Sequence, residues 1–458
     1  MTVEQPKTRL SFRAPQVIFW TALALRIACI VIGHTYKIKS DQGDFYFGFE
    51  AGRIARSLVQ GHGYANPFNG FSGPTAWLPP LYPLLIALSF KLFGVYSRGA
   101  AFFVLACNSI FSAAIVPAIY EIAARCMDAG GIARRRSKHA APVALWSAWT
   151  WAVYPAALQY AIHWFWEMSL STCLFTWALV VALRLRRIGE LDDQDPAPGD
   201  TWGLWLVLGL LWGLVALSNA SLLLMFPASI AWVLWPHLRD SKFRGGLKQA
   251  VMGGALACVI FAAALAPWIA RNERDLHAFI PTRSNFGVEL WQSTHFYYMG
   301  FPWGTAMSMW PGDPEFRDYV RLGEVEFAHE KGAEALENLR AHPGLFWRNT
   351  GIRLYFFWFG VPHPTEPHPE NEVVRMLNYS VLSVGGVLGL LLALRRRVPG
   401  AWLMAMAFLL VPAVYYAVTV QARFRHPLEP LIAILAVYLF RSTEPRSAPG
   451  SAKTYAGS

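Results

Sequence analysis

Long apolar runs separated by short polar connections dominate this sequence. A helix needs roughly 20 apolar residues, each rising about 1.5 Å, to cross the roughly 30 Å hydrocarbon layer of a bilayer. The chain offers about ten runs of this kind. The pattern therefore predicts an all-α polytopic membrane protein with spans at 16–33, 98–124, 141–158, 163–183, 202–217, 220–235, 247–269, 374–394, 401–419 and 427–441.

Basic residues predict the orientation of these spans. If the N-terminus is cytoplasmic, every basic cluster falls in a connection on the cytoplasmic side, which is the positive-inside pattern. The clusters are Arg125, Arg134, Arg135, Arg136 and Lys138, then Arg184, Arg186 and Arg187, then Arg239, Lys242, Arg244 and Lys248, then Arg395, Arg396 and Arg397. The formal net charge of +11 is therefore explained by membrane topology. The sequence lacks a basic face with interleaved aromatic residues, so we expect no nucleic-acid partner.

Composition excludes an ordinary soluble enzyme, because 55% of the side chains are apolar and only 15% are charged. The five cysteines lie within or at the ends of apolar runs without a CxxC pair, so we expect neither a disulfide framework nor a thiolate metal site. We expect a multi-pass protein of the plasma membrane, the inner membrane in a bacterium. One membrane domain over 1–441, with an uncleaved first span, would be followed by a disordered tail over 442–458.

Two long loops fall on the side opposite the basic clusters, at 34–97 and 270–373. The same parity places the turn 421–427 there. Within the loops we expect extracytoplasmic juxtamembrane helices rather than spans, because the apolar run at 80–93 is too short to cross and Arg348 and Arg353 would be costly in hydrocarbon. These helices are predicted at 45–60, 80–93, 313–340 and 345–360.

Arg26 lies in the middle of the first predicted span. An unpaired charge there would cost about 3 kcal/mol. We therefore expect Arg26 to face the bundle interior and to pair with Glu121 or Asn108.

The most informative stretch, 40–83, reads SDQGDFYFGFEAGRIARSLVQGHGYANPFNGFSGPTAWLPPLYP. Asp44 stands just beyond the first span, on the outer side. A carboxylate near water stays ionised, since the ordinary pKa of Asp is about 3.9, and it can accept a proton from an attacking hydroxyl. Spacing alone equally allows Asp41 or Asp44 to cap the helix that follows.

The run GDFYFGFEAGRIARSLVQGHGY followed by GPTAWLPPLYPLLIAL resembles the first extracytoplasmic loop of a known family. The family comprises the protein O-mannosyltransferase and aminoarabinose-transferase-like enzymes of the GT-C glycosyltransferase superfamily. Further similarities are PWIARN at 267–272, FG at 286–287 and RFRHPLEP at 423–430. With the hydropathy profile, the resemblance extends to about Phe440, and the order and placement of the motifs make it specific.

The resemblance implies a GT-C type fold and an inverting glycosyltransferase. Such an enzyme transfers a monosaccharide from a polyprenyl-phosphate carrier to an acceptor on the outer side of the membrane. The family's proposed catalytic base maps to Asp44. Since the lipid phosphate is already a good leaving group, the site needs cations on the phosphate side more than a general acid. Outward-facing cations that could bind the donor phosphate, or simply lipid headgroups, are Arg271, Arg423, Arg425 and His426.

Glu167 stands where the family often carries a second acidic residue. It could position the acceptor, share the role of base, or be an interfacial acid beside Trp164 and Trp166. Spacing reveals no three-ligand metal site, so no cofactor is assigned and a divalent cation requirement stays open.

One position departs from the family pattern. Relatives with a Lys immediately before the Pro-Pro pair use it near the carrier phosphate, whereas Leu78 precedes Pro79 and Pro80 here. This argues against the aminoarabinose enzyme itself and leaves the sugar open, as well as the lipid, glycan or protein acceptor. The alternatives are a polytopic transporter or lipid-carrier flippase without glycosyl transfer, and a ligase that joins preformed glycans.

Overall fold

The computed structural model describes residues 15–38, 47–128, 142–189, 200–239, 245–295, 307, 309–361 and 369–442. Within these ranges every regular element is a helix, apart from one isolated antiparallel bridge between Ala65 and Pro74. The all-α prediction is therefore confirmed. The predicted disordered tail lies outside the described residues, except for Ser442.

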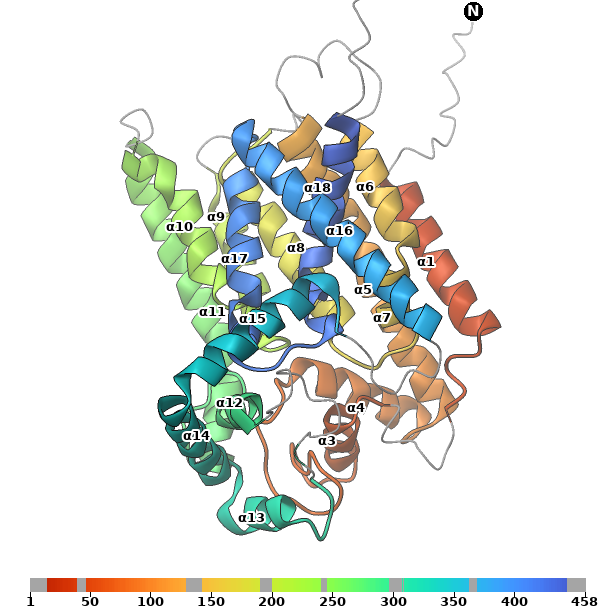
Figure 1. The fold of residues 1–458 in the computed structure, drawn as a ribbon, viewed down its shortest axis with the longest axis vertical. Helices are drawn as coiled ribbons and strands as arrows, with labels where there is room; N and C mark the ends of the chain where they lie inside the picture. Colours follow the sequence, from red (N-terminus) through yellow and green to blue (C-terminus); the bar gives the residue numbers. More distant parts are fainter. Residues whose placement is uncertain are drawn as a thin grey trace, which may run out of the picture.

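The helices at the predicted spans form one bundle (Figure 1). They are α1 (Pro15–Ile32), α5 (Arg98–Ala123), α6 (Pro142–Val153), α7 (Pro155–Ile162), α8 (Met168–Leu185), α9 (Trp202–Ala216), α10 (Met225–Arg239), α11 (Leu247–Leu276), α16 (Pro369–Arg395), α17 (Ala401–Ala417) and α18 (Glu429–Ser442). In the described part of the chain, six segments are long and apolar enough to cross a membrane, and α6, α9 and α17 are shorter apolar helices. The chain is thus a multi-pass membrane protein.

A second layer lies at one end of the bundle (Figure 1). It contains α3 (Glu50–Val59), α4 (Leu81–Phe93), α12 (Phe286–His295), α13 (Pro314–Leu322) and α14 (Glu324–Ala341), with α15 (Pro343–Phe359) between it and the bundle. We call it the outer layer. The juxtamembrane helices predicted at 45–60, 80–93 and 345–360 are present. The single helix predicted at 313–340 is wrong, because Gly323, at φ +80°, separates α13 from α14.

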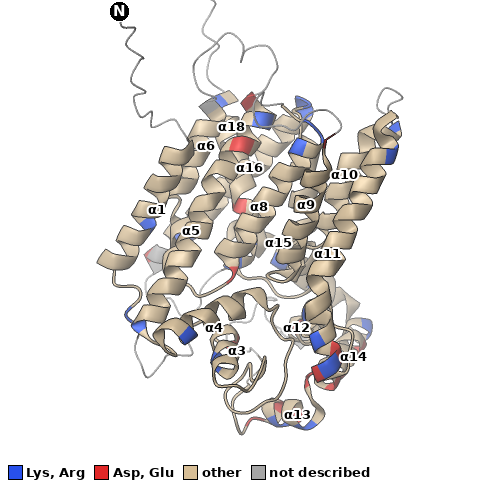
Figure 2. Ribbon diagram, turned by 180° about the vertical axis from the view of Figure 1, so that it is seen from behind, with Lys and Arg blue, Asp and Glu red and all other residues tan. Residues whose placement is uncertain are grey.

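Lys and Arg residues lie at the end of the bundle opposite the outer layer, and others lie in the outer layer itself (Figure 2). Arg125, Arg184, Arg239 and Arg395 lie in the last turns of helices that end there. The described members of the predicted clusters thus share one end. The side of the membrane that this end faces remains a prediction.

The predicted span 141–158 is broken into two helices. Tyr154 is extended, at φ −64° and ψ 122°, because the ring of Pro155 disfavours helical backbone in the residue before it. Proline also lacks an N–H, so the carbonyl of Trp151 loses its helical donor. The buried guanidinium of Arg26 on α1 donates to this carbonyl at 3.3 Å and to that of Ala152 at 3.0 Å.

Arg26 therefore faces the bundle interior, as predicted, but its predicted partners were wrong. Glu121 instead binds Arg125 at 2.7 Å and Arg184 at 2.6 Å, near the basic end. Asn108 donates to the carbonyl of Trp164 at 3.1 Å. Arg26 pairs instead with the carbonyls at the helix break, which the hydropathy pattern does not reveal.

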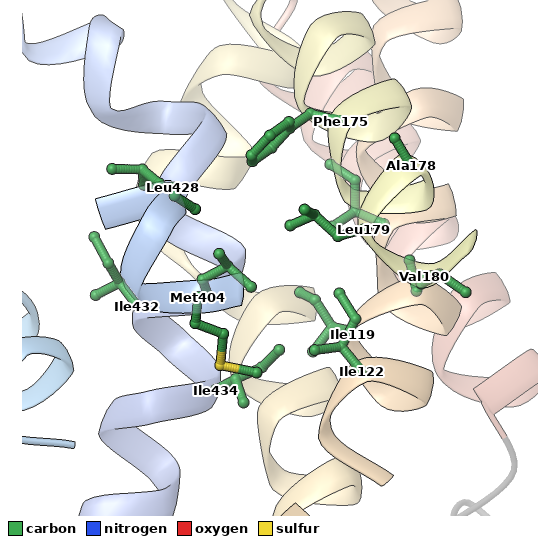
Figure 3. Packing of buried hydrophobic residues seen from close by; sticks show 14 of the residues in the cluster. Ile119, Ile122, Phe175, Ala178, Leu179, Val180, Met404, Leu428, Ile432 and Ile434 are labelled. Atoms are coloured by element: carbon green, nitrogen blue, oxygen red, sulfur yellow. The ribbon is translucent and has the colours of Figure 1, made fainter. Parts of the chain in front are cut away.

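The centre of the bundle is closely packed, and this fixes the helix ends that carry the site. Phe175, Leu179 and Ile119 face Met404 and Ile432 across the core (Figure 3). α16 approaches α18 through glycines: a Cβ on Gly389 would lie 2.1 Å from the carbonyl oxygen of Leu435. Small residues allow such close approach between membrane helices.

A buried carboxylate joins the two long outer loops. Oε1 of Glu324 accepts hydrogen bonds from the backbone N–H of Ala76 and the hydroxyl of Ser284, both at 2.6 Å. Its Oε2 accepts from the hydroxyl of Tyr319 at 2.7 Å and from that of Thr75. Glu324 thereby holds the GPTAWLPP segment against α13 and α14.

Glu324→Gln is expected to loosen this junction. The amide has one acceptor oxygen instead of two, so a buried donor such as the N–H of Ala76 loses its partner, at a cost of about 1–3 kcal/mol in the free energy of unfolding. Thermal unfolding and protease cleavage of the outer layer in detergent would measure this. Glu326→Gln, on an exposed face of the same helix, is the control, and equal stability of the two variants would contradict the assigned role.

Candidate functional site

A cavity of about 250 Å³ lies where the outer layer meets the bundle. Its wall combines α12, the end of α17, the 3₁₀ turns η3 (Ala220–Leu222) and η5 (Ala422–Leu428), and the linker between α7 and α8. We call it the charged cavity. Its polar side chains include Glu167, Asn219, Arg283, Asn285, Glu289 and Thr419.

Glu167 reaches this cavity because the helix begins later than the predicted span 163–183. α8 begins only at Met168, and the preceding residues form a non-helical linker. In that linker the rings of Trp164 and Trp166 stack at 4.3 Å, and the carbonyl of Trp164 accepts from Asn108 rather than from a helical N–H. The linker therefore aims Glu167 at the cavity rather than along a helix.

Arg423 lies beside the same linker, with its guanidinium 4.0 Å from the ring centre of Trp166. Burial lowers the pKa of Arg423, and the nearby carboxylates of Glu167, Glu50 and Glu289 oppose that shift. Burial likewise raises the pKa of Glu167, which the charge of Arg423 partly offsets. The pKa of Glu50, at the start of α3, is also raised by burial. The charge of Arg423 is thus coupled electrostatically to three carboxylates.

Glu289 forms the opposite wall and is fixed by neighbouring side chains. Its carboxylate accepts from the hydroxyl of Thr419 at 3.2 Å and from the amide of Asn285 at 3.3 Å, and it lies 3.5 Å from Arg283. A Cβ on Gly287 would lie 2.1 Å from a carbonyl oxygen of α14. This glycine therefore lets α12 pack closely enough to present Glu289 to the cavity.

The predicted phosphate ligand Arg271 is engaged by the first outer loop. Its guanidinium donates to the carbonyl of Thr75 at 2.6 Å and to that of Tyr64 at 2.5 Å, and it pairs with Asp275 at 3.0 Å. It also lies over the rings of Tyr64 and Trp268, each centre 5.3 Å away. Arg271 thus ties α11 to that loop, and it does not line the charged cavity.

Arg425 and His426 are fully buried and share the carboxylate of Glu429, at 3.3 and 2.9 Å. Arg425 also donates to the carbonyl of Trp358 at 3.2 Å and to the hydroxyl of Ser383. Both residues follow Arg423 in η5 but point into the bundle. A role for either in binding donor phosphate remains a prediction.

Two solved structures share this fold over nearly the whole chain. The oligosaccharyltransferase of Archaeoglobus fulgidus in the apo form matches with a TM-score of 0.51 at 14% identity, covering 93% of this chain and 50% of that chain. The oligosaccharyltransferase AglB from the same organism, in complex with an inhibitory peptide and a dolichol-phosphate, gives a TM-score of 0.52 at 13% identity with the same coverage. The chain therefore has a fold similar to that of this archaeal oligosaccharyltransferase.

The chain spans about half the length of the archaeal enzyme. ArnT from Cupriavidus metallidurans bound to undecaprenyl phosphate also matches, at 13% identity over 93% of this chain and 76% of that chain, but its TM-score of 0.37 adds nothing to the fold assignment. No protein-family model and no curated protein matches the sequence.

Asp44 lies in 39–46, outside the described residues, so its role stays a prediction. The residues that follow it lie against the linker that carries Glu167. The ring of Phe47 packs 4.7 Å from that of Phe165, and Gly48, at φ +78°, approaches the carbonyl of Phe165 where a Cβ would lie at 2.2 Å.

Sequence reasoning missed Glu50, Arg283 and Glu289. Glu50 belongs to the stretch that carries the family resemblance, and Glu289 follows the FG pair at 286–287 closely, but neither spacing indicates a common site. In the part of the chain that the structure describes, no three His, Cys, Asp or Glu side chains are grouped to hold a metal ion.

Proposed function

We propose that this protein is a glycosyltransferase that moves a monosaccharide from a polyprenyl-phosphate carrier to an acceptor at the outer surface of the membrane. The observation that carries the proposal is the charged cavity, which Glu167 and Glu289 line, with the buried Arg423 guanidinium against Trp166 of the adjoining linker. Carboxylates that accept a proton and a guanidinium that pairs with phosphate are the groups this reaction needs.

In the proposed reaction, an acceptor hydroxyl oxygen bonds to the anomeric carbon while the bond from that carbon to the phosphate oxygen breaks, which inverts the configuration. The hydroxyl proton passes to Asp44, and Glu167 positions the acceptor. The carrier departs with a negative charge on its phosphate, which Arg423 stabilises by charge pairing. Because burial concentrates these charges in a poorly hydrated space, their interactions are stronger than in water.

A groove of about 410 Å³ on the side of the bundle suits the polyprenyl chain. Val153, Tyr154 and Pro155 of the α6–α7 break line one side, and Leu377 and Val381 of α16 line the other. In this proposal the apolar tail lies in that groove, open to the bilayer, while the phosphate reaches the polar end of the bundle.

His426 lies near the end of α6 that lines this groove, because its ring is 5.5 Å from that of Trp151. Arg425 adjoins His426 and shares the carboxylate of Glu429 with it. We therefore propose that Arg425 and His426 contact the donor phosphate between the groove and the charged cavity, next to Arg423.

The function is tested with purified protein in proteoliposomes. Polyprenyl phosphate carrying one radiolabelled sugar is compared with a carrier bearing a preassembled oligosaccharide, using membrane lipid and glycan extracts as acceptors. Transfer from the single-sugar carrier is expected. Movement of intact carrier across the bilayer without any new glycosidic product would support the flippase alternative and overturn the proposal.

The location of the site is tested by reporter fusions. A reporter inserted at Arg135 is expected to report the cytoplasm, and one at Pro311, beside α13, the outside, because the basic clusters remain on the cytoplasmic side. The opposite pair of results would place the charged cavity on the cytoplasmic side.

A further inference from the structure

A second cavity, of about 210 Å³, lies between α12, α14 and α15. We call it the neutral cavity. The polar and aromatic side chains in its wall are Ser293, Thr294, Asn338, His342, Phe346 and Asn349.

The chemistry of this wall differs from that of the charged cavity. Among the described residues, no Asp, Glu, Lys or Arg side chain lines it. The hydroxyls of Ser293 and Thr294 donate to the carbonyls of Leu290 and Trp291, at 2.7 and 2.9 Å. Their oxygens therefore retain lone pairs that can accept hydrogen bonds from a ligand.

This combination suits an uncharged ligand that is rich in hydroxyl groups. The half-buried ring of Phe346 offers an apolar face whose negative quadrupole attracts C–H groups of a sugar ring. Amide groups can both donate to and accept from sugar hydroxyls. Among the described residues of this wall, a charged ligand would find no carboxylate, ammonium or guanidinium to pair with.

α12 connects the two cavities. Glu289 lines the charged cavity and Ser293 lines the neutral one. Residues four apart on a helix share a face, with Cβ atoms about 5–6 Å apart. A ligand in the neutral cavity therefore lies about one helical turn from the carboxylate wall of the charged cavity.

α15 connects the cavities a second time. Arg353 follows Asn349 by one turn, is fully buried, and lies 5.7 Å from the ring centre of Phe346. It donates to the carbonyl of Val418 at 2.5 Å, and Val418 lines the charged cavity. Arg353 thus fixes the wall between the two cavities from inside the bundle.

We infer that the neutral cavity binds a sugar unit of the acceptor and presents its hydroxyl to the charged cavity. The acceptor would then be a glycan or glycolipid rather than a protein segment. The inference rests on the proposed function for its place in the reaction, but binding of a sugar is measurable without turnover.

The test uses saturation-transfer NMR on the full chain in nanodiscs, with methyl glycosides of common neutral hexoses, pentoses and N-acetylhexosamines as probes. At least one glycoside is expected to bind, and Phe346→Ala to weaken it about tenfold through loss of ring contact. Asn338→Trp fills the cavity and should abolish binding. Trp347→Ala and Glu337→Trp, at neighbouring exposed positions, should bind as the parent does.

Glu167 lies in the charged cavity, so the variant Glu167→Gln should bind the glycosides normally even if transfer is lost. This variant distinguishes a failure of catalysis from a failure of binding in the neutral cavity. No glycoside binding, or binding that Phe346→Ala and Asn338→Trp leave unchanged, would overturn the inference. Competition by a neutral tetrapeptide such as acetyl-Ala-Gly-Ser-Ala amide, without glycoside binding, would indicate a protein acceptor instead.

Discussion

Asp44→Asn is expected to lower the rate of sugar transfer by about 10²–10⁴-fold, the usual contribution of a general base. The amide is nearly isosteric with the carboxylate but is a poor proton acceptor. Expression and membrane topology should be unchanged, since the residue precedes the described anchor at Phe47 and Gly48. Initial rates with labelled donor, in membranes holding equal amounts of protein, measure the effect.

Asp41→Asn is the matched control, three residues earlier in the same segment. It should retain transfer. If Asp44 merely caps the following helix, Asp44→Asn would cost about 1 kcal/mol of stability and keep its turnover, and that result would reject the role of base.

Arg423→Gln is expected to lower kcat/KM by about 10²–10³-fold, because a charged group facing the departing phosphate is lost.

The variant should also change the pH dependence of transfer. Burial raises the pKa of Glu167 and Arg423 opposes this rise, so without the guanidinium the pKa rises further. If Glu167 acts as a carboxylate, its active form is lost as pH falls through this pKa, and the acid limb of the rate profile moves to higher pH.

Rate profiles of the parent, Arg423→Gln and Arg274→Gln measure this shift. Arg274 is an exposed arginine on α11, paired with Asp275, and its replacement should leave the profile unchanged. A profile for Arg423→Gln that superimposes on the parent after scaling would contradict the coupling to Glu167. Recovery of rate at higher pH would support it.

The corrections to the predicted helices have local causes. The pattern of 141–158 is apolar throughout, but Pro155 breaks the backbone at Tyr154. The run at 163–183 contains no proline, yet the stacked Trp164 and Trp166 remain outside α8. Hydropathy measures how apolar a run is and does not register either effect. The second break matters most, because it places Glu167 in a linker instead of on a helix face.

Apolar length and charge position are local properties, so the sequence alone predicts several membrane-crossing helices and two long loops on the side opposite the basic clusters. It also provides Glu167 and Arg423 as candidate site residues. Which candidates lie close together depends on tertiary packing. Arg425 and His426 point into the bundle and pair with Glu429. Glu289 lines the cavity and accepts a hydrogen bond from Thr419, which lies 130 residues later in the sequence. Such proximity follows from packing between distant segments, which no local pattern encodes.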